Sequence, residues 1–185
     1  MQSGEDRLIA RHFRPLATAP GALSLSDDAA FFAPPPGYEV VLKTDAIVAG
    51  VHFLPDDPPD SIGKKALRVN LSDLAAKGAA PAGCLMTLAL PEAISEGWLE
   101  SFAAGLKADC EQFACPLYGG DTVRTPGPVS ISIFVFGLLP QGTMVRRAGA
   151  KVGHRIFVSG SVGDAALGLK LLQEPARKTR KISKS

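Results

Sequence analysis

The chain has few cysteines and no long apolar segment, and both shortages limit what it can be. Its three cysteines, Cys84, Cys110 and Cys115, are an odd number without a pairing framework, so a disulfide-stapled secreted domain is not expected. The longest apolar run, residues 129–140, is too short to cross a bilayer and is typical of a buried strand. The first residues carry acidic side chains instead of the basic stretch and apolar core of a secretory signal peptide. We therefore expect a cytoplasmic protein with no membrane partner.

An excess of positive charge is also missing from the body of the chain. The 20 lysines and arginines outnumber the 18 acidic residues, but five of the basic residues fall in the last nine positions. Without those five, 15 basic residues face 18 acidic ones, which leaves the body near −3. Such a body offers no general basic surface, so nucleic acid is not an expected partner.

Several well-known signatures are absent. There is no Walker A lysine motif and no kinase-type catalytic loop. Residues 160–164 resemble a dinucleotide-binding loop only loosely, because they lack the Gly-x-Gly-x-x-Gly order and follow the other strands. The spacing of Cys110 and Cys115 is that of half a zinc site, but it lies on an amphipathic helix without a second pair of ligands, which favours buried structural thiols.

The order of elements predicts the fold class. At 185 residues and 46% apolar content, the chain is long enough for one domain, or for one domain and the start of another. Apolar periodicity predicts helices at 5–16, 61–77, 95–113 and 165–172, and strands at 39–44, 83–90, 129–139 and 155–159. Ser61 is the expected cap of the second helix and Gly78 its end, and residues 24–32 are expected to be extended. Because strands and helices alternate, we predict an α/β (α+β) sandwich, a mixed β-sheet with helices packed on one face.

Five aspartates are the main indication of function. Asp27, Asp28, Asp45, Asp73 and Asp121 lie at or near the expected edges of apolar elements among small residues. Each alone could be a turn, cap or solvated residue. If the fold gathers them, however, like charges about 4 Å apart repel by roughly 4 kcal/mol at an effective dielectric near 20, so a cation must offset them. Oxygen donors without a histidine and cysteine cluster favour Mg²⁺, and Mg²⁺ can bridge them to a polyphosphate.

Three other features are candidate ligand contacts, and two of them have an alternative structural interpretation. Gly119 and Gly120, before Asp121, allow a backbone to approach a phosphate or ribose closely. His52 is either a satisfied, partly buried histidine or a substrate contact. The adjacent Arg146 and Arg147 are either exposed loop charges or a phosphate clamp.

The motifs, taken in order, resemble thiamine-monophosphate kinase over residues 4–173. They are Ser-Asp-Asp-Ala, Lys-Thr-Asp-Ala-Ile-Val-Ala-Gly-Val-His-Phe-Leu, Lys-Ala-Leu-Arg-Val-Asn-Leu-Ser-Asp-Leu-Ala-Ala-Lys-Gly-Ala, Gly-Gly-Asp-Thr and Val-Ser-Gly-Ser-Val-Gly-Asp-Ala-Ala-Leu-Gly-Leu. The resemblance implies the N-terminal ATP-binding domain of the aminoimidazole ribonucleotide synthetase-like superfamily, which dimerises through its sheet. It also implies ATP-dependent phosphorylation of thiamine monophosphate to thiamine diphosphate, with Mg²⁺ and with ATP as co-substrate.

Carried over position by position, the resemblance implies roles for individual residues. The implied magnesium ligands are Asp28, Thr44, Asp45, Asp73 and Asp121, with Asp27 in support. Gly120, Asp121 and Arg147 would bind ATP, and His52 would face the thiamine phosphate. This chain departs from the family at Lys43, where serine or threonine is common and would add a metal ligand, and at Ser24 and Ser26, which replace glycines.

The resemblance also implies a domain organisation. Residues 1–150 correspond to the Mg/ATP-binding and dimerisation domain, and residues 151–174 to the start of a second domain. Residues 175–185 do not resemble the family, and because they are basic and polar without apolar periodicity, we expect a disordered tail there. A fragment, a frameshifted product and a genuine half-protein are all compatible with this pattern. Two rival functions therefore stay open, namely a non-catalytic metal-nucleotide binding or dimerisation module and another ATP-dependent synthetase of the superfamily.

Overall fold

A computed structural model describes residues 4–173, and these residues contain a four-stranded sheet with helices. The strands are β1 (Tyr38–Val48), β2 (Ala80–Leu90), β3 (Leu117–Arg124) and β4 (Ser130–Pro140). The longer helices are α2 (Pro59–Lys77), α3 (Glu96–Gln112) and α4 (Asp164–Gln173). Short helical segments are α1 (Gly4–Leu8), η1 (Ile9–Phe13), η2 (Arg14–Leu16), η3 (Pro20–Leu25) and η4 (Arg147–Gly149).

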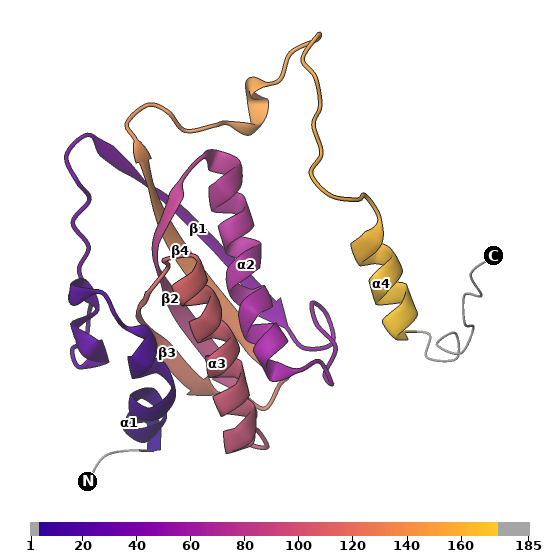
Figure 1. The fold of residues 1–185 in the computed structure, drawn as a ribbon. Helices are drawn as coiled ribbons and strands as arrows, with labels where there is room; N and C mark the ends of the chain where they lie inside the picture. The colour runs from indigo at the N-terminus through magenta and orange to yellow at the C-terminus, as the bar shows by residue number, and fades with distance from the viewer. Residues whose placement is uncertain (1–3, 174–185) are drawn as a thin grey trace. The chain divides into compact units, whose positions relative to one another are not determined.

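The sheet is mixed and has the order β1-β4-β2-β3. Strands β2 and β3 pair in parallel, and β4 runs antiparallel to both β1 and β2. The connections β1–α2–β2 and β2–α3–β3 both cross the sheet in the same direction. Because such crossovers are right-handed, both helices must lie on one face. Figure 1 shows α2 and α3 side by side on that face, which confirms the predicted mixed sheet with helices on one side.

The main core lies between the sheet and these two helices. The side chains of β4 that face the helices are fully buried, and they pack against residues such as Leu67 of α2 and Phe102 of α3. The helices approach each other closely at Gly105, where a Cβ atom would lie 2.1 Å from the Asp60 carbonyl oxygen. Arg68 of α2 also binds the buried Asp109 of α3 through two hydrogen bonds, at 2.6 and 2.8 Å. Apolar burial and this bidentate pair together hold the helical layer in register.

The opposite face of the sheet is covered only in part. The segment before β1 packs against it through Phe32, whose ring contacts the rings of Tyr118 and Phe136. The neighbouring part of the face remains open, and Tyr38 and Leu42 of β1 are 47% and 62% exposed there. One layer of the sandwich is therefore helical, and the other face presents apolar side chains to its surroundings.

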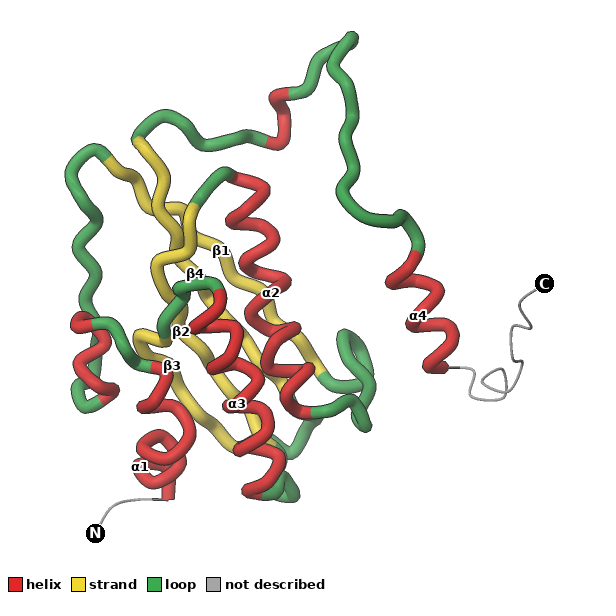
Figure 2. The backbone as a smooth tube through the Cα atoms, viewed as in Figure 1, coloured by secondary structure: helices red, strands yellow, loops and turns green. Residues whose placement is uncertain are grey.

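The chain divides into two compact units after Arg146. The second unit contains η4 and α4, joined by a loop (Figure 2). The helix predicted at 165–172 is confirmed as α4. The strand predicted at 155–159 is wrong, since these residues form no strand, and Ile156 and Phe157 are 93% and 86% exposed. An apolar run becomes a strand only beside another strand, and none of β1–β4 pairs with it.

Other predictions of elements were right in kind and wrong in detail. Gly78 ends α2 in the left-handed conformation, as expected, but the helix begins two residues before Ser61, and the Ser61 hydroxyl donates instead to the Pro58 carbonyl. The first two residues of the extended segment predicted at 24–32 belong instead to η3, which ends at Leu25. The predicted tail at 175–185 lies outside the described residues.

In the described part of the chain, no helix is both long and apolar enough to span a bilayer.

Candidate functional site

Two of the predicted ligands meet beside a lysine at the β1 edge of the sheet. Lys43 and Asp45 are two residues apart on β1, so their side chains share a face, and α2 brings Asp73 onto the same face. The Lys43 ammonium lies 2.9 Å from Asp45 Oδ1 and 2.8 Å from Asp73 Oδ2. The side chains of Lys43, Asp45 and Asp73 are 27%, 42% and 51% exposed, so this Lys43 cluster is open to solvent and ions.

The charges in the Lys43 cluster stabilise one another. The hydrogen bond to Asp73, followed by the one to Asp45, raises the pKa of Lys43 above its ordinary value. The ammonium therefore stays charged at neutral pH and compensates one of the two carboxylates. A net negative charge remains, which suits the cluster to a further cation.

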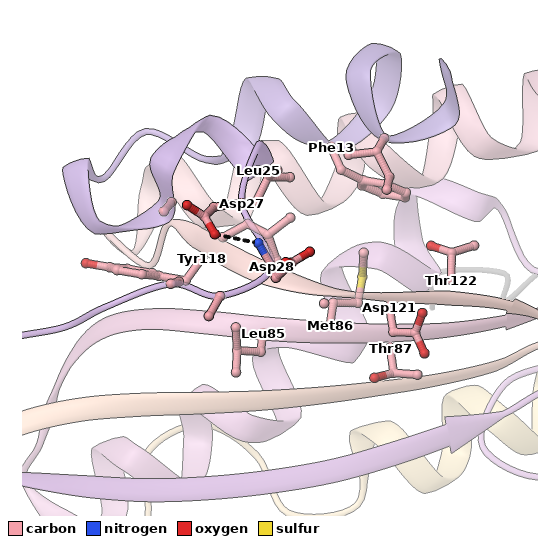
Figure 3. Close-up of a pocket in the computed structure, with 17 residues that line it drawn as sticks. Phe13, Leu25, Asp27, Asp28, Leu85, Met86, Thr87, Tyr118, Asp121 and Thr122 are labelled. Atoms are coloured by element: carbon pink, nitrogen blue, oxygen red, sulfur yellow. Dashed lines mark hydrogen bonds between the residues drawn. The ribbon is translucent and has the colours of Figure 1, made fainter. Parts of the chain in front are cut away.

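The other predicted acids line a cavity at the β3 edge of the sheet. This Asp121 pocket has a volume of about 540 Å³ and lies between β2, β3 and the segment before β1. Its acidic and hydroxyl side chains are Asp27, Asp28, Thr87, Asp121 and Thr122. Figure 3 shows Asp121 beside Thr87 on neighbouring strands, with Thr122 and Met86 pointing the other way. The remaining wall is largely apolar, so the pocket combines oxygen ligands with a surface for a flat organic group.

The acidic pair in this pocket has two different local environments. The Asp28 backbone N–H donates to Asp27 Oδ1 at 2.8 Å, an interaction that Figure 3 marks. Asp27 thus stabilises its own turn. Asp28 lines the pocket together with Asp121.

The pairing of β2 with β3 requires a residue without a side chain at position 120. A Cβ atom there would lie 1.8 Å from the Met86 carbonyl oxygen on β2. By contrast, a Cβ atom at Gly119 would meet only the end of the Leu85 side chain, at 3.4 Å. The close approach that the glycines allow is therefore between two strands at Gly120, whatever ligand the pocket takes.

The Lys43 cluster and the Asp121 pocket lie at opposite edges of the sheet. Asp45, Ile133, Met86 and Gly120 form one row across the four strands, so Asp45 is level with the residue before Asp121. Three strand spacings separate the edge strands, which is about 14 Å. Among residues 4–173, no group of three or more histidine, cysteine, aspartate or glutamate side chains is arranged to hold a metal ion. One copy therefore brings Asp45 near Asp73 and Asp28 near Asp121, but it does not join the two pairs.

The expectation that the aspartates mark element edges needs correction. Strand β1 continues three residues past Asp45, β3 continues three residues past Asp121, and Asp73 lies within the last two turns of α2. The sequence did not indicate that the strands continue, because their last residues follow short polar motifs. Pairing of β1 with β4, and of β3 with β2, extends both strands beyond their apolar parts.

The remaining predicted site residues lie apart from these pairs. The Thr44 side chain is on the other face of β1 from Asp45, and its hydroxyl donates to the Ile133 carbonyl. His52 follows β1 in an exposed turn, where its Nδ1 accepts a hydrogen bond from the Val48 backbone at 3.1 Å, so the neutral ring carries its proton on Nε2. Arg147 is exposed in η4 and belongs to the second unit.

Two neighbours of these acids were not predicted from the sequence, namely Lys43 as the shared ion-pair partner of Asp45 and Asp73, and Thr87 as the neighbour of Asp121. The spacing of Lys43 and Asp45 was visible, but Asp73 joins them only through the packing of α2 on the sheet. Thr87 lies beside Asp121 because β2 pairs with β3, a contact between distant segments that no local pattern indicates.

Comparison with known proteins decides the family. Residues 26–139 match the family described as AIR synthase related protein, N-terminal domain. These residues contain the sheet except its last residue, the helices α2 and α3, and the acids of both the Lys43 cluster and the Asp121 pocket. The chain belongs to this family. Among curated proteins, the thiamine-monophosphate kinase of Caulobacter vibrioides is 48% identical over 162 residues, which cover 87% of this chain and 46% of the relative. The thiamine-monophosphate kinase of Escherichia coli K12 is 43% identical over 175 residues, covering 94% of this chain and 53% of the relative.

Solved structures of thiamine-monophosphate kinases agree with these relatives. The thiamine-monophosphate kinase of Stenotrophomonas maltophilia K279a has a TM-score of 0.79 and 43% identity, covering 92% of this chain and 52% of that one. AaThiL complexed with AMPPCP and TMP has a TM-score of 0.72 and 37% identity, covering 80% and 47%. The resemblance found in the motifs is thus confirmed, and the chain spans about half the length of the curated relatives it matches.

Proposed function

We propose that this chain forms the N-terminal half of a thiamine-monophosphate kinase, which transfers a phosphoryl group from ATP to thiamine monophosphate and yields thiamine diphosphate. The observation that carries this proposal is the 43–48% identity to such kinases over most of the chain. The related structure of AaThiL with AMPPCP and TMP supports the pair of substrates. The acids of the two edge sites supply the chemistry that such a reaction needs.

The oxygen ligands fit magnesium. Asp45 and Asp73 would hold Mg²⁺ at one edge, and Asp28 and Asp121 would hold it at the other. Thr44, also implied as a ligand by the resemblance, joins neither pair in one copy, because its side chain lies on the other face of β1. When bound, Mg²⁺ neutralises polyphosphate charge and fixes the phosphates in place. The nearby carboxylates orient the bound ions and repel unbound anions.

The acceptor explains why no nucleophile and base pair is needed. A phosphate monoester has a second pKa of about 6, so the acceptor is already largely ionised at neutral pH. Transfer then depends mainly on in-line positioning and on charge neutralisation. We expect no covalent enzyme intermediate.

Nucleotide and substrate contacts follow from the same assignment. Gly120 and Asp121 bind the nucleotide in the Asp121 pocket, whose apolar wall offers a surface for a base or a sugar. Arg147 holds ATP phosphate, because a guanidinium matches phosphate oxygens in pairs. His52 faces the phosphate of thiamine monophosphate and presents Nε2–H as a donor, since Nδ1 already binds the Val48 backbone.

The working protein is proposed to be a cytoplasmic homodimer that associates through the open sheet face. Exposed apolar side chains on this face, including Tyr38, Val40 and Leu42, support the assignment.

A non-catalytic metal-nucleotide binding or dimerisation module is the second candidate. The observation that favours it is the separation of the two acidic pairs, since residues 4–173 contain no group of three or more acids, histidines or cysteines arranged to hold a metal ion. Another ATP-dependent synthetase of the superfamily is less well supported. The hydrogenase maturation protein HypE, for example, is only 22% identical with a TM-score of 0.62, which shows a common fold.

Thiamine diphosphate formation tests the proposal directly. The chain is incubated with ATP, Mg²⁺ and thiamine monophosphate, alone and with the C-terminal half of a full-length relative. We expect Mg²⁺-dependent ATP binding by the chain alone and product only when both halves are present.

Two variants provide the comparison. Asp121→Asn should lower product formation by about a hundredfold, the effect of removing one electrostatic contact to the transition state. Asp56→Asn, which changes an exposed acid in the loop after β1, should retain activity. Mg²⁺-dependent ATP binding without any product in the two-half mixture would favour the binding module.

A further inference from the structure

The Lys43 ammonium occupies the place where a cation would bind the Asp45 and Asp73 carboxylates. It lies within 2.9 Å of an oxygen from each, and these contacts join β1 to α2. Lys43 is also the least exposed of the three, at 27%. This arrangement differs from an ordinary surface ion pair, because one ammonium serves two acids from different elements.

A divalent ion and this ammonium compete for the same oxygens. Mg²⁺ binds oxygens at 2.0–2.1 Å and needs nearly ideal octahedral geometry. An ammonium left between the same two carboxylates would block part of that shell and repel the ion. For Mg²⁺ to bind Asp45 and Asp73 together, the Lys43 side chain must move away.

We propose that Lys43 is a built-in counter-ion that holds the Asp45–Asp73 pair together and lowers its affinity for divalent cations. The inference rests on the proposed function, because it concerns the same metal-binding residues. It predicts that divalent ions bind this pair by displacing a lysine, so the affinity of the pair is set by Lys43 as well as by the two acids.

The chain offers a matched control in Lys64. This lysine contacts one acid, Asp60, at 3.0 Å and four residues away on α2, with similar exposure. Removing Lys64 changes the net charge by the same amount as removing Lys43. It leaves the Asp45–Asp73 pair unchanged.

Binding of Mn²⁺ to the full chain without nucleotide tests the proposal, with free Mn²⁺ measured by electron paramagnetic resonance. Lys43→Met removes the ammonium but keeps an apolar stem, and Lys43→Ser removes it and adds a hydroxyl. Both variants should bind Mn²⁺ at this pair about tenfold more tightly than the original chain, whereas Lys64→Met should not. Adding Asp45→Asn to Lys43→Met should abolish the gain.

Thermal unfolding provides a second measurement. Without divalent ions, both Lys43 variants should unfold at lower temperature than the original chain, and Mn²⁺ should raise their midpoints more than it raises that of Lys64→Met. If Lys43→Met does not fold without ions, circular dichroism should show refolding when Mn²⁺ is added. A failure to refold would count against the counter-ion role.

Two binding results would overturn the inference. Unchanged Mn²⁺ affinity in both Lys43 variants would show that the ammonium does not compete with divalent ions. A gain in Lys43→Ser alone would assign the effect to the new hydroxyl. The kinase proposal is tested separately, since a gain in both variants without thiamine diphosphate formation by the two halves would reject the kinase and keep the counter-ion.

Discussion

Individual residues in this protein serve two purposes that the sequence does not separate. Gly120 lies in a motif expected to approach a ligand, yet its lack of a side chain is first required by the Met86 carbonyl of the neighbouring strand. Asp27 is acidic and lies beside Asp28, yet it stabilises its own turn. A residue of a functional motif can therefore have a structural role: it keeps in place the backbone that carries the residues of the site.

Gly120→Ala provides a test at this scale. The new Cβ would collide with the backbone of β2, so we expect a loss of about 3 kcal/mol in the free energy of unfolding, the upper end for overpacking. Gly119→Ala, which meets only the flexible end of Leu85, should change stability by much less. Urea unfolding followed by circular dichroism measures both. Equal stability of the two variants would contradict the strand-packing role of Gly120.

At the scale of elements, the layers are held together by contacts that differ between the two faces. The helical face is held by continuous apolar burial and by the bidentate contact between Arg68 and Asp109. The other face depends on the small aromatic group of Phe32, Tyr118 and Phe136, which attaches the segment before β1 and so forms one wall of the Asp121 pocket.

Alkaline pH should weaken this attachment. Burial raises the pKa of Tyr118 above its ordinary value of 10. Because the folded state disfavours the phenolate, the stabilisation is complete below pH 10 and is lost as the pH rises through the higher pKa of the folded state. The unfolding midpoint should therefore fall as the pH rises above about 10, and it should fall less in Tyr118→Phe.

The two tyrosines of the chain allow a controlled comparison. Tyr38→Phe changes a half-exposed ring and should keep the full alkaline decrease. At pH 8, Tyr118→Phe should cost about 1 kcal/mol or less, because the volume is nearly conserved. An identical pH dependence in Tyr118→Phe and Tyr38→Phe would show that the buried phenol is not responsible.

At the scale of the whole molecule, the exposed apolar side chains of residues 4–173 include two groups that matter for assembly. One is the open face of the sheet, around Tyr38, Val40 and Leu42. The other lies in the second unit, where Ile156 and Phe157 are exposed. The first is explained by the proposed dimer.

Leu42→Lys tests the proposed dimer. Placing a charge in a buried apolar interface should weaken association by about a hundredfold. Val51→Lys, at an exposed apolar residue in the turn after β1, should leave association unchanged. Sedimentation velocity over a range of protein concentrations measures both. A monomeric original chain at high concentration, or equal association of the two variants, would contradict dimerisation through this face.

Much of the fold and part of the site followed from the sequence alone. Periodic apolar residues predicted α2, α3, β1, β2 and β4, because burying one face of a helix or strand imposes that pattern. They did not predict β3, whose motif around Gly119 and Gly120 carries little apolar periodicity. Short motifs around Asp28, Asp45, Asp73 and Asp121 predicted the family, since their residue types and spacing are specific. The tertiary structure decided the rest. Strand pairing placed Asp45 and Asp121 at opposite edges, helix packing brought Asp73 to Lys43, and the apolar residues 155–159 found no strand to pair with. The physical reason is that helical and strand periodicity is local, whereas the neighbours of a charge depend on contacts between distant segments.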